Sequence, residues 1–100
     1  MLERCLPTGA TEVLDLAAGT GPLTTGLLDL GLSVIAVEPL DDMRALIPPA
    51  ARAIAGTAEH IPLPDDSVDA VFIGQAWHWF DIPRAVAEVH RVLRPGGTMT

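Results

Sequence analysis

The sequence predicts an α/β fold built on a doubly wound parallel sheet. Short apolar runs alternate with segments in which apolar residues recur at helical spacing. A turn that contains two glycines joins the first apolar run to the first of these helical segments. Strands that alternate with helices pair in parallel through right-handed crossovers, so we expect both faces of the sheet to be covered.

Length and composition fit a single small domain. The chain has 100 residues, of which 49% are hydrophobic, a fraction that argues against disorder. The pattern predicts the tail of a helix over Leu2–Pro7, before the first strand, and a last strand that begins only at Thr98. We therefore expect residues 1–100 to form one incomplete domain in which the last strands of the sheet are missing.

The first strand is expected over Thr11–Ala17, an apolar run that contains one acid, Asp15. Gly19 and Gly21 follow, and glycine permits both a tight turn and a close approach of the backbone to a ligand. A carboxylate inside an apolar strand is unfavourable without a partner. We therefore expect Asp15 to meet a functional partner or a hydrogen bond at a helix terminus.

The first helix is expected to begin at Pro22 and to end at Gly31. The second strand, residues 32–38, ends in Glu38, and an acid at this place after a glycine turn can hold both hydroxyls of a ribose. A cofactor that contains a nucleoside is therefore the first hypothesis. The apolar face of the first helix would comprise Leu23, Leu27, Leu28 and Leu30.

The middle of the chain predicts a short helix and a short strand. Asp41 or Asp42 is expected to cap the helix, which Pro48 would end. A third strand follows over residues 52–57, and residues 58–67 form a loop. The apolar residues that we assign to this helix are Met43, Leu46 and Ile47.

The last third predicts a buried strand and an amphipathic helix. Residues 68–74 are nearly all apolar, as a strand covered on both faces should be. Asp81 is expected to cap the helix, with Arg91 and Arg94 in its final turn, where cations suit the helix dipole. A turn at residues 95–97 then leads into the last strand. The apolar face of the helix would comprise Ile82, Val86, Val89 and Leu93.

Charge and composition argue against several other classes of function. The formal net charge is −7 and all six basic residues are arginine, which is a poor match for a nucleic acid. No run approaches the length of a membrane span and no apolar signal segment opens the chain, so we expect a cytoplasmic location. The single cysteine, Cys5, cannot form an internal disulfide, and no His/Cys/Asp spacing resembles a metal site.

Four segments together resemble class I S-adenosylmethionine-dependent methyltransferases of the type 11 methyltransferase domain family. They are residues 13–21, 37–39, 56–69 and 91–97, and they follow one another in the family's order. Residues 75–81 further resemble a subgroup similar to trans-aconitate methyltransferases. The resemblance implies a Rossmann-like sheet of strand order 3-2-1-4-5, S-adenosylmethionine as the cofactor and a small molecule as the methyl acceptor.

The same resemblance implies roles for individual residues. Asp15 and the loop after the first strand would hold the methionine part of the cofactor, and Glu38 would bind its ribose hydroxyls. Gln75, just past the fourth strand, would lie near the transferring methyl group. The loop residues concerned are Ala17, Gly19, Thr20 and Gly21, and the residues that would line the adenine are Pro39, Met43, Thr57, Ala58 and Glu59.

Methyl transfer from a sulfonium has an activated leaving group, so the protein mainly positions the reactants. A compact catalytic triad is therefore not expected. His78 has a pKa range that suits a general base, and it is either the catalytic residue or part of the pocket lining between Trp77 and Trp79. Two positions depart from the family's pattern, because many members have glycine at Ala17 and aspartate at Thr57.

Two alternatives stay open at this point. An oxidoreductase that binds NAD shares the glycine turn and the acid, but Thr24 stands where its third glycine would be. A non-catalytic remnant, which binds the cofactor weakly or serves only as a partner module, is suggested by the incomplete ends. We expect these residues alone to bind the cofactor without efficient turnover.

Overall fold

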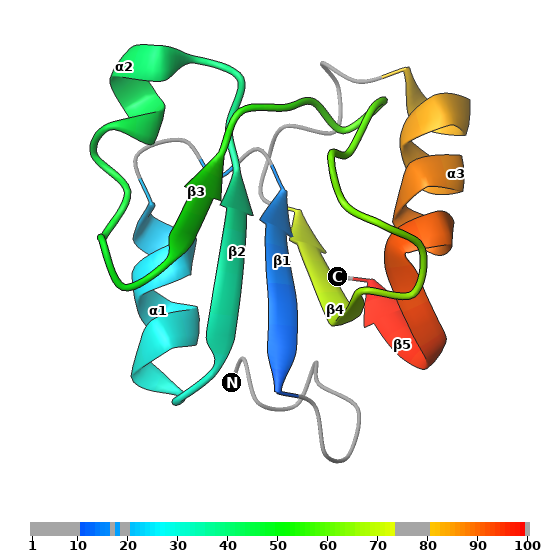
Figure 1. Ribbon diagram of the computed structural model, residues 1–100, viewed down its shortest axis with the longest axis horizontal. Coiled ribbons are helices and arrows are strands. Elements are labelled where there is room, and N and C mark those ends of the chain that lie inside the picture. Colours follow the sequence, from blue (N-terminus) through cyan, green and yellow to red (C-terminus); the bar gives the residue numbers. More distant parts are fainter. Residues whose placement is uncertain (1–10, 17, 19–20, 74–80, 100) are drawn as a thin grey trace.

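The computed structural model describes residues 11–16, 18, 21–73 and 81–99 (Figure 1). Within that part of the chain, five parallel strands form one sheet in the order β3-β2-β1-β4-β5. The α/β fold and the strand order that the sequence predicts are thus confirmed. The strands are β1 (Glu12–Leu16), β2 (Ser33–Val37), β3 (Arg52–Ile54), β4 (Val68–Ile73) and β5 (Leu93–Met99).

Helices and one long loop cover the two faces of the sheet. Alternate residues of β1 face opposite ways, so Val13 packs with Leu27 of α1 (Pro22–Asp29), whereas Leu14 packs in a second core. That second core includes Val89 of α3 (Ile82–Val92) and the loop residue Ile61. Helix α1 packs beside β2, and α3 packs beside β5 (Figure 1).

The glycine turn starts α1 as expected. Gly21 precedes the helix with a φ of 98°, a left-handed conformation that favours glycine, and Pro22 follows at the first helical position. Leu27 is fully buried, but Leu30 is 40% exposed and was wrongly placed on the apolar face. The helix ends at Asp29, so Leu30 no longer continues its buried stripe. Thr24 takes a fully buried place on α1 instead.

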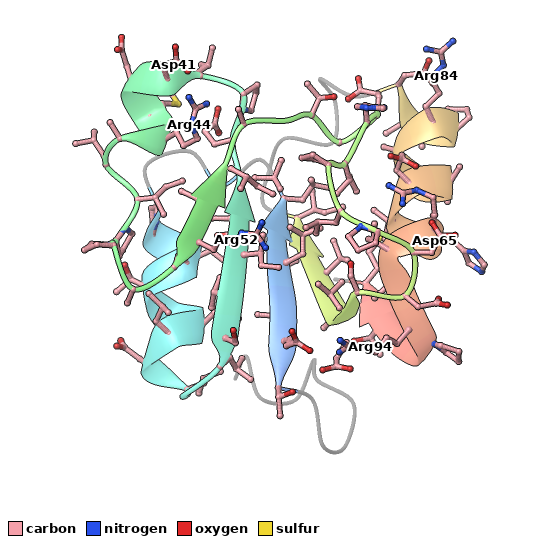
Figure 2. The ribbon with its side chains drawn as sticks, viewed as in Figure 1. Asp41, Arg44, Arg52, Asp65, Arg84 and Arg94 are labelled. Atoms are coloured by element: carbon pink, nitrogen blue, oxygen red, sulfur yellow. The ribbon has the colours of Figure 1, made fainter. Side chains whose placement is uncertain are left out.

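The second helix is shorter than the sequence predicts. In α2 (Asp41–Arg44) the N-terminal flanking residue is Leu40, which makes no side-chain cap, so neither aspartate caps the helix. Asp41 lies inside the first turn and forms an ion pair with Arg44 (Figure 2). After the helix, the Leu46 and Ile47 amides each donate a hydrogen bond to the carbonyl three residues earlier. This tighter turn brings Ile47 into the core while Leu46 stays exposed.

The last helix confirms its cap but only Val89 of its predicted apolar face. The Asp81 carboxylate accepts a bond of 3.4 Å from the Arg84 amide. Ile82 and Val86 are each more than 40% exposed, because the helix is rotated so that a neighbouring stripe meets the sheet. Leu93 begins β5 and Arg94 follows it on that strand, so Arg94 does not lie in the final turn of the helix as predicted, because α3 ends at Val92. The buried residues of α3 are Ala85, Val89 and Val92.

Two strand boundaries also differ from the prediction. Strand β3 ends at Ile54, and Thr57 instead forms an isolated antiparallel bridge with His60. Strand β5 begins at Leu93, before the predicted turn, because Leu93 already pairs with Val68 of β4; the ladder is then irregular until Thr98 pairs with Ala70. None of the helices built from described residues is long and apolar enough to cross a membrane.

An ionic network holds the strands together at the end of the sheet where they begin. The Arg94 guanidinium donates to Glu12 Oε1 at 2.6 Å and to Asp69 Oδ1 at 3.0 Å. The other Asp69 oxygen accepts from the Thr11 and Glu12 amides. Figure 2 places Arg94 at the end of the sheet opposite Asp41 and Arg44, so this network is remote from the carboxyl ends of the strands.

Candidate functional site

The carboxyl ends of three adjacent strands meet at one edge of the sheet. In the ladders, Leu16 of β1 lies opposite Val37 of β2 and Ile73 of β4. The chain proceeds outward from β1 through β2 to β3 on one side, and through β4 to β5 on the other. Ligands of open α/β sheets bind at this kind of switch point, outside the carboxyl ends of the strands.

Asp15 is a buried acid close to this edge. Its side chain is only 1% exposed, and Oδ2 accepts a bond of 2.5 Å from the Thr24 hydroxyl on the first turn of α1. Burial raises the pKa of Asp15 to about 6, the Thr24 bond opposes that rise, and the negative charge of Glu38 adds to it. Asp15 therefore has the hydrogen bond near a helix terminus that its place in an apolar strand requires.

Glu38 directly follows β2 and is 5% exposed. Its amide donates to the Ile54 carbonyl at 3.1 Å, and its carboxylate Oε2 accepts from the Leu40 amide at 2.8 Å. Arg44 donates from Nη1 to the Glu38 carbonyl oxygen at 3.0 Å. These bonds fix both the backbone and the carboxylate of Glu38 at the end of the strand.

The start of the loop after β1 lies against the end of β2. The Ala18 amide donates to the Val37 carbonyl at 3.1 Å, and the Gly21 amide donates to the Ala18 carbonyl at 3.1 Å. A side chain on Gly21 would come within 2.9 Å of Pro48 Cδ, so this turn packs closely on the segment that follows α2. The structure thus brings Asp15, the described part of the glycine turn and Glu38 together.

The predicted adenine-lining residues lie on two segments beside Glu38. Pro39 and Thr57 are exposed, Met43 is 41% exposed and Ala58 is buried. A Cβ on Gly56 would lie 3.3 Å from Val37 Cγ1, which places the segment that leads to Thr57 over the end of β2. Pro39 directly follows Glu38, and Met43 precedes Arg44, which bonds to the Glu38 carbonyl, so both segments lie near the carboxyl edge of the sheet.

Glu59 has a partner outside this edge. Its carboxylate Oε2 accepts a bond of 3.2 Å from the Asp81 amide, immediately before α3. The bond ties the loop after β3 to the start of the last helix. Five of the predicted site residues, Ala17, Gly19, Thr20, Gln75 and His78, lie outside the described residues.

Two contributions were missed by sequence reasoning. Thr24 was considered only as a missing glycine, yet its hydroxyl is the side-chain partner of Asp15. Arg91 was interpreted as a helix-end charge, but its guanidinium donates to the carbonyls of Ile61 and Leu63 at 2.8 and 2.7 Å. Glu88 pairs with Arg91 and accepts from the Ile61 amide, so together they fasten the loop to α3.

The family profile described as "Methyltransferase domain" matches residues 14–100. Two curated relatives span nearly the same part of the chain. An uncharacterized methyltransferase of Mycobacterium tuberculosis is 58% identical, over 98% of this chain and 42% of its own length. A malonyl-[acyl-carrier protein] O-methyltransferase of Pectobacterium atrosepticum is 35% identical, over 88% of this chain and 36% of its own length.

A solved structure has the same fold. It is a candidate methyltransferase from an antibiotic biosynthesis pathway of Anabaena variabilis, 36% identical, with a TM-score of 0.87. The match covers 98% of this chain and 41% of that chain. The present chain therefore spans about two fifths of the length of the proteins it resembles.

Proposed function

The chain belongs to the methyltransferase domain family, and from this premise we propose that it binds S-adenosylmethionine for methyl transfer to a small-molecule acceptor. S-adenosylmethionine is the usual cofactor of that family. The present residues would supply mainly the half of the domain that binds the cofactor. The observation that carries the proposal is the pair of buried acids, Asp15 and Glu38, at the ends of adjacent strands.

The residues of this edge fit such a cofactor. Two buried carboxylates repel each other, as the effect of Glu38 on Asp15 indicates, and a ligand that carries positive charge would relieve that repulsion. Asp15 and the glycine turn would hold the amino-acid part of the cofactor. Glu38 would accept hydrogen bonds from the ribose hydroxyls, with Pro39, Met43 and residues 57–59 around the adenine.

The residues of the chain would act by positioning rather than by covalent chemistry. When bound, the cofactor supplies an activated methyl group on a positively charged sulfur. The edge at β1, β2 and β4 would hold that group in line with the acceptor atom at near-attack distance. Gln75 would lie close to the methyl group, and His78 would line the acceptor pocket or remove a proton from acceptors that need it.

Binding of the two candidate cofactors tests the proposal. S-adenosylhomocysteine should raise the midpoint of thermal unfolding, whereas NADH should leave it unchanged. Protection by NADH alone would favour an oxidoreductase. Absence of binding at millimolar S-adenosylmethionine by a folded sample would reject the proposal for this chain.

The acceptor is tested separately with a panel of small carboxylic acids. A carboxylate needs no proton removed before it accepts a methyl group, so this class depends least on a general base. Among the relatives, the Pectobacterium protein is named as a malonyl-[acyl-carrier protein] O-methyltransferase. Efficient transfer of labelled methyl to one acid of the panel would support an oxygen acceptor and would contradict our expectation that these residues alone bind the cofactor without efficient turnover. Transfer only to amines would contradict an oxygen acceptor.

A further inference from the structure

We propose that Thr24 is a positioning residue whose hydroxyl holds the Asp15 carboxylate ionised and in one orientation at the cofactor site. The inference rests on the proposed function of the site, and it assigns a task to a residue outside the predicted binding set. Thr24 would not touch the cofactor. It would act through Asp15.

The geometry of α1 places Thr24 over β1. The helix begins directly after Gly21, so Thr24 is the third residue of its first turn. Its side chain is fully buried, and its hydroxyl donates to Asp15 Oδ2 at 2.5 Å. A buried hydroxyl needs a hydrogen-bond partner, and a bond to a carboxylate is among the stronger ones that a neutral donor makes. A hydrophobic residue of the same shape would fill this position without that bond.

Apart from Thr24, the described residues of the neighbouring strands offer little to favour the charged form of Asp15. Its register partners are Ala36 on β2 and Phe72 on β4, both apolar. The charge that acts on Asp15 from beyond β2 is that of Glu38, which is negative and opposes ionisation. Among the described residues that influence Asp15, the Thr24 hydroxyl is thus the group that favours the carboxylate.

The Asp15 carboxyl changes its protonation state close to neutral pH. Its pKa stands at about 6 with the Thr24 bond in place. Since a hydrogen bond to the charged form lowers a pKa, loss of the hydroxyl would raise it further. Asp15 would then be about half protonated at pH 7 and would offer only part of its negative charge to the amino group of the cofactor.

Three variants separate this role from simple packing. Thr24→Val removes the hydroxyl and keeps the shape, and Thr24→Ser keeps the hydroxyl. Thr25→Val is a matched control, because the Thr25 hydroxyl also lies on the first turn but donates to the Gly21 carbonyl at 3.1 Å. The Asp15 pKa is read from carboxyl ¹³C NMR titration of the ligand-free protein, and the affinity for S-adenosylhomocysteine from calorimetry between pH 5.5 and 8.5.

Thr24→Val should raise the Asp15 midpoint by about one pH unit or more, since a hydrogen bond to a charged group contributes about that much. Binding of S-adenosylhomocysteine should weaken about twofold at pH 7 and by more than about fivefold below pH 6, and it should recover toward pH 8.5. Thr24→Ser should restore the midpoint and the affinity, and Thr25→Val should change neither. Thr24→Ala replaces Thr24→Val if the valine variant does not fold.

An Asp15 midpoint that stays at the wild-type value in a folded Thr24→Val protein would overturn the inference. A midpoint that moves equally in Thr25→Val would also overturn it, because the effect would then belong to the helix turn as a whole. Failure of the wild-type protein to bind S-adenosylhomocysteine at any pH would reject the proposed function instead. The NMR titration needs no cofactor, so it still decides whether Thr24 controls Asp15.

Discussion

Burial raises the pKa of Asp15 on β1, and the negative charge of Glu38, which directly follows β2, raises it further. Both acids are at least 95% buried, with exposed fractions of 1% and 5%. Burial of two like charges near each other is unfavourable in the ligand-free protein. We therefore expect the two acids to lower the stability of the ligand-free protein and to strengthen the binding of the ligand.

Asp15→Asn is expected to stabilise the ligand-free protein above pH 6. The pKa of Asp15 rises from an ordinary value of 3.8 to about 6 on folding, so between these values the folded state holds a proton that the unfolded state has released. The contribution of Asp15 to the free energy of unfolding therefore falls as pH rises from about 4 to 6, and stays low above that. The variant should gain on the order of 1 kcal/mol at pH 7.5 in urea unfolding.

The exposed Asp29→Asn variant controls for the change in net charge. A clear loss of stability at pH 7.5 in Asp15→Asn, with Asp29→Asn unchanged, would contradict the assigned cost of burying Asp15.

Asp69 should have the opposite pH dependence. Two backbone amides and Arg94 bond to its carboxylate and lower its pKa from 3.8 to about 2. Its contribution to stability is thus complete above about pH 4 and is lost as pH falls toward 2. Asp69→Asn should lower the free energy of unfolding at pH 7 by about 1–2 kcal/mol, with a difference that shrinks below pH 4.

Urea unfolding at pH 7 and pH 3 measures that difference. Asp66→Asn is the matched control, because Asp66 is exposed and asparagine tolerates its φ of 53°. Equal losses in the free energy of unfolding at pH 7 in the two variants would show that the hydrogen bonds of Asp69 add no stability beyond that of an exposed carboxylate.

Arg91→Met should loosen the loop that follows β3. The variant removes charged hydrogen bonds to the carbonyls of Ile61 and Leu63 and to Asp65, at a cost of about 1.5–3 kcal/mol in stability. Hydrogen exchange at the Ile61 amide should accelerate, since its partner Glu88 loses the arginine that orients it.

Arg84→Met on the same helix serves as the control for Arg91→Met. The Arg84 side chain is 78% exposed and makes an ion pair only with the neighbouring Asp81 among the described residues, at 3.6 Å. Unchanged exchange at Ile61 in Arg91→Met would mean that the loop is held by its apolar contacts alone.

Gly21→Ala should destabilise the protein more than Gly31→Ala. Both glycines have a positive φ, of 98° and 80°, which costs alanine on the order of 1 kcal/mol. Only at Gly21 would the added methyl group also meet another residue, because Pro48 Cδ would lie 2.9 Å away. We expect an additional loss of about 1–3 kcal/mol at Gly21 from this overlap. Equal losses in denaturant unfolding would show that Pro48 moves aside without cost.

Local chemistry made much of the fold predictable. The apolar run of β1 and the glycine at position 21 are signals within a few residues of each other, and the structure places both as predicted. The need of Asp15 for a partner was also predictable from burial. That Thr24 meets this need was not, because the match depends on how α1 lies over β1.

The features that sequence reasoning missed depend on contacts between distant segments. Arg91 has five donors that suit helix ends and carbonyls equally, and only the path of the loop at Ile61 selects its partners. Similarly, Val86 and Val89 fit one apolar face by spacing, but the rotation of α3 against the sheet leaves Val86 exposed. Spacing alone does not determine that rotation.

Glu38→Gln gives the most direct test of the proposal that the Glu38 carboxylate binds the ribose hydroxyls of S-adenosylmethionine. Calorimetry with S-adenosylhomocysteine is compared for the wild type, Glu38→Gln and Asp29→Asn. We predict binding by the wild type, at least about tenfold weaker binding by Glu38→Gln since charged hydrogen bonds are lost, and no change in Asp29→Asn. Equal affinities of a folded Glu38→Gln protein and the wild type would contradict this account.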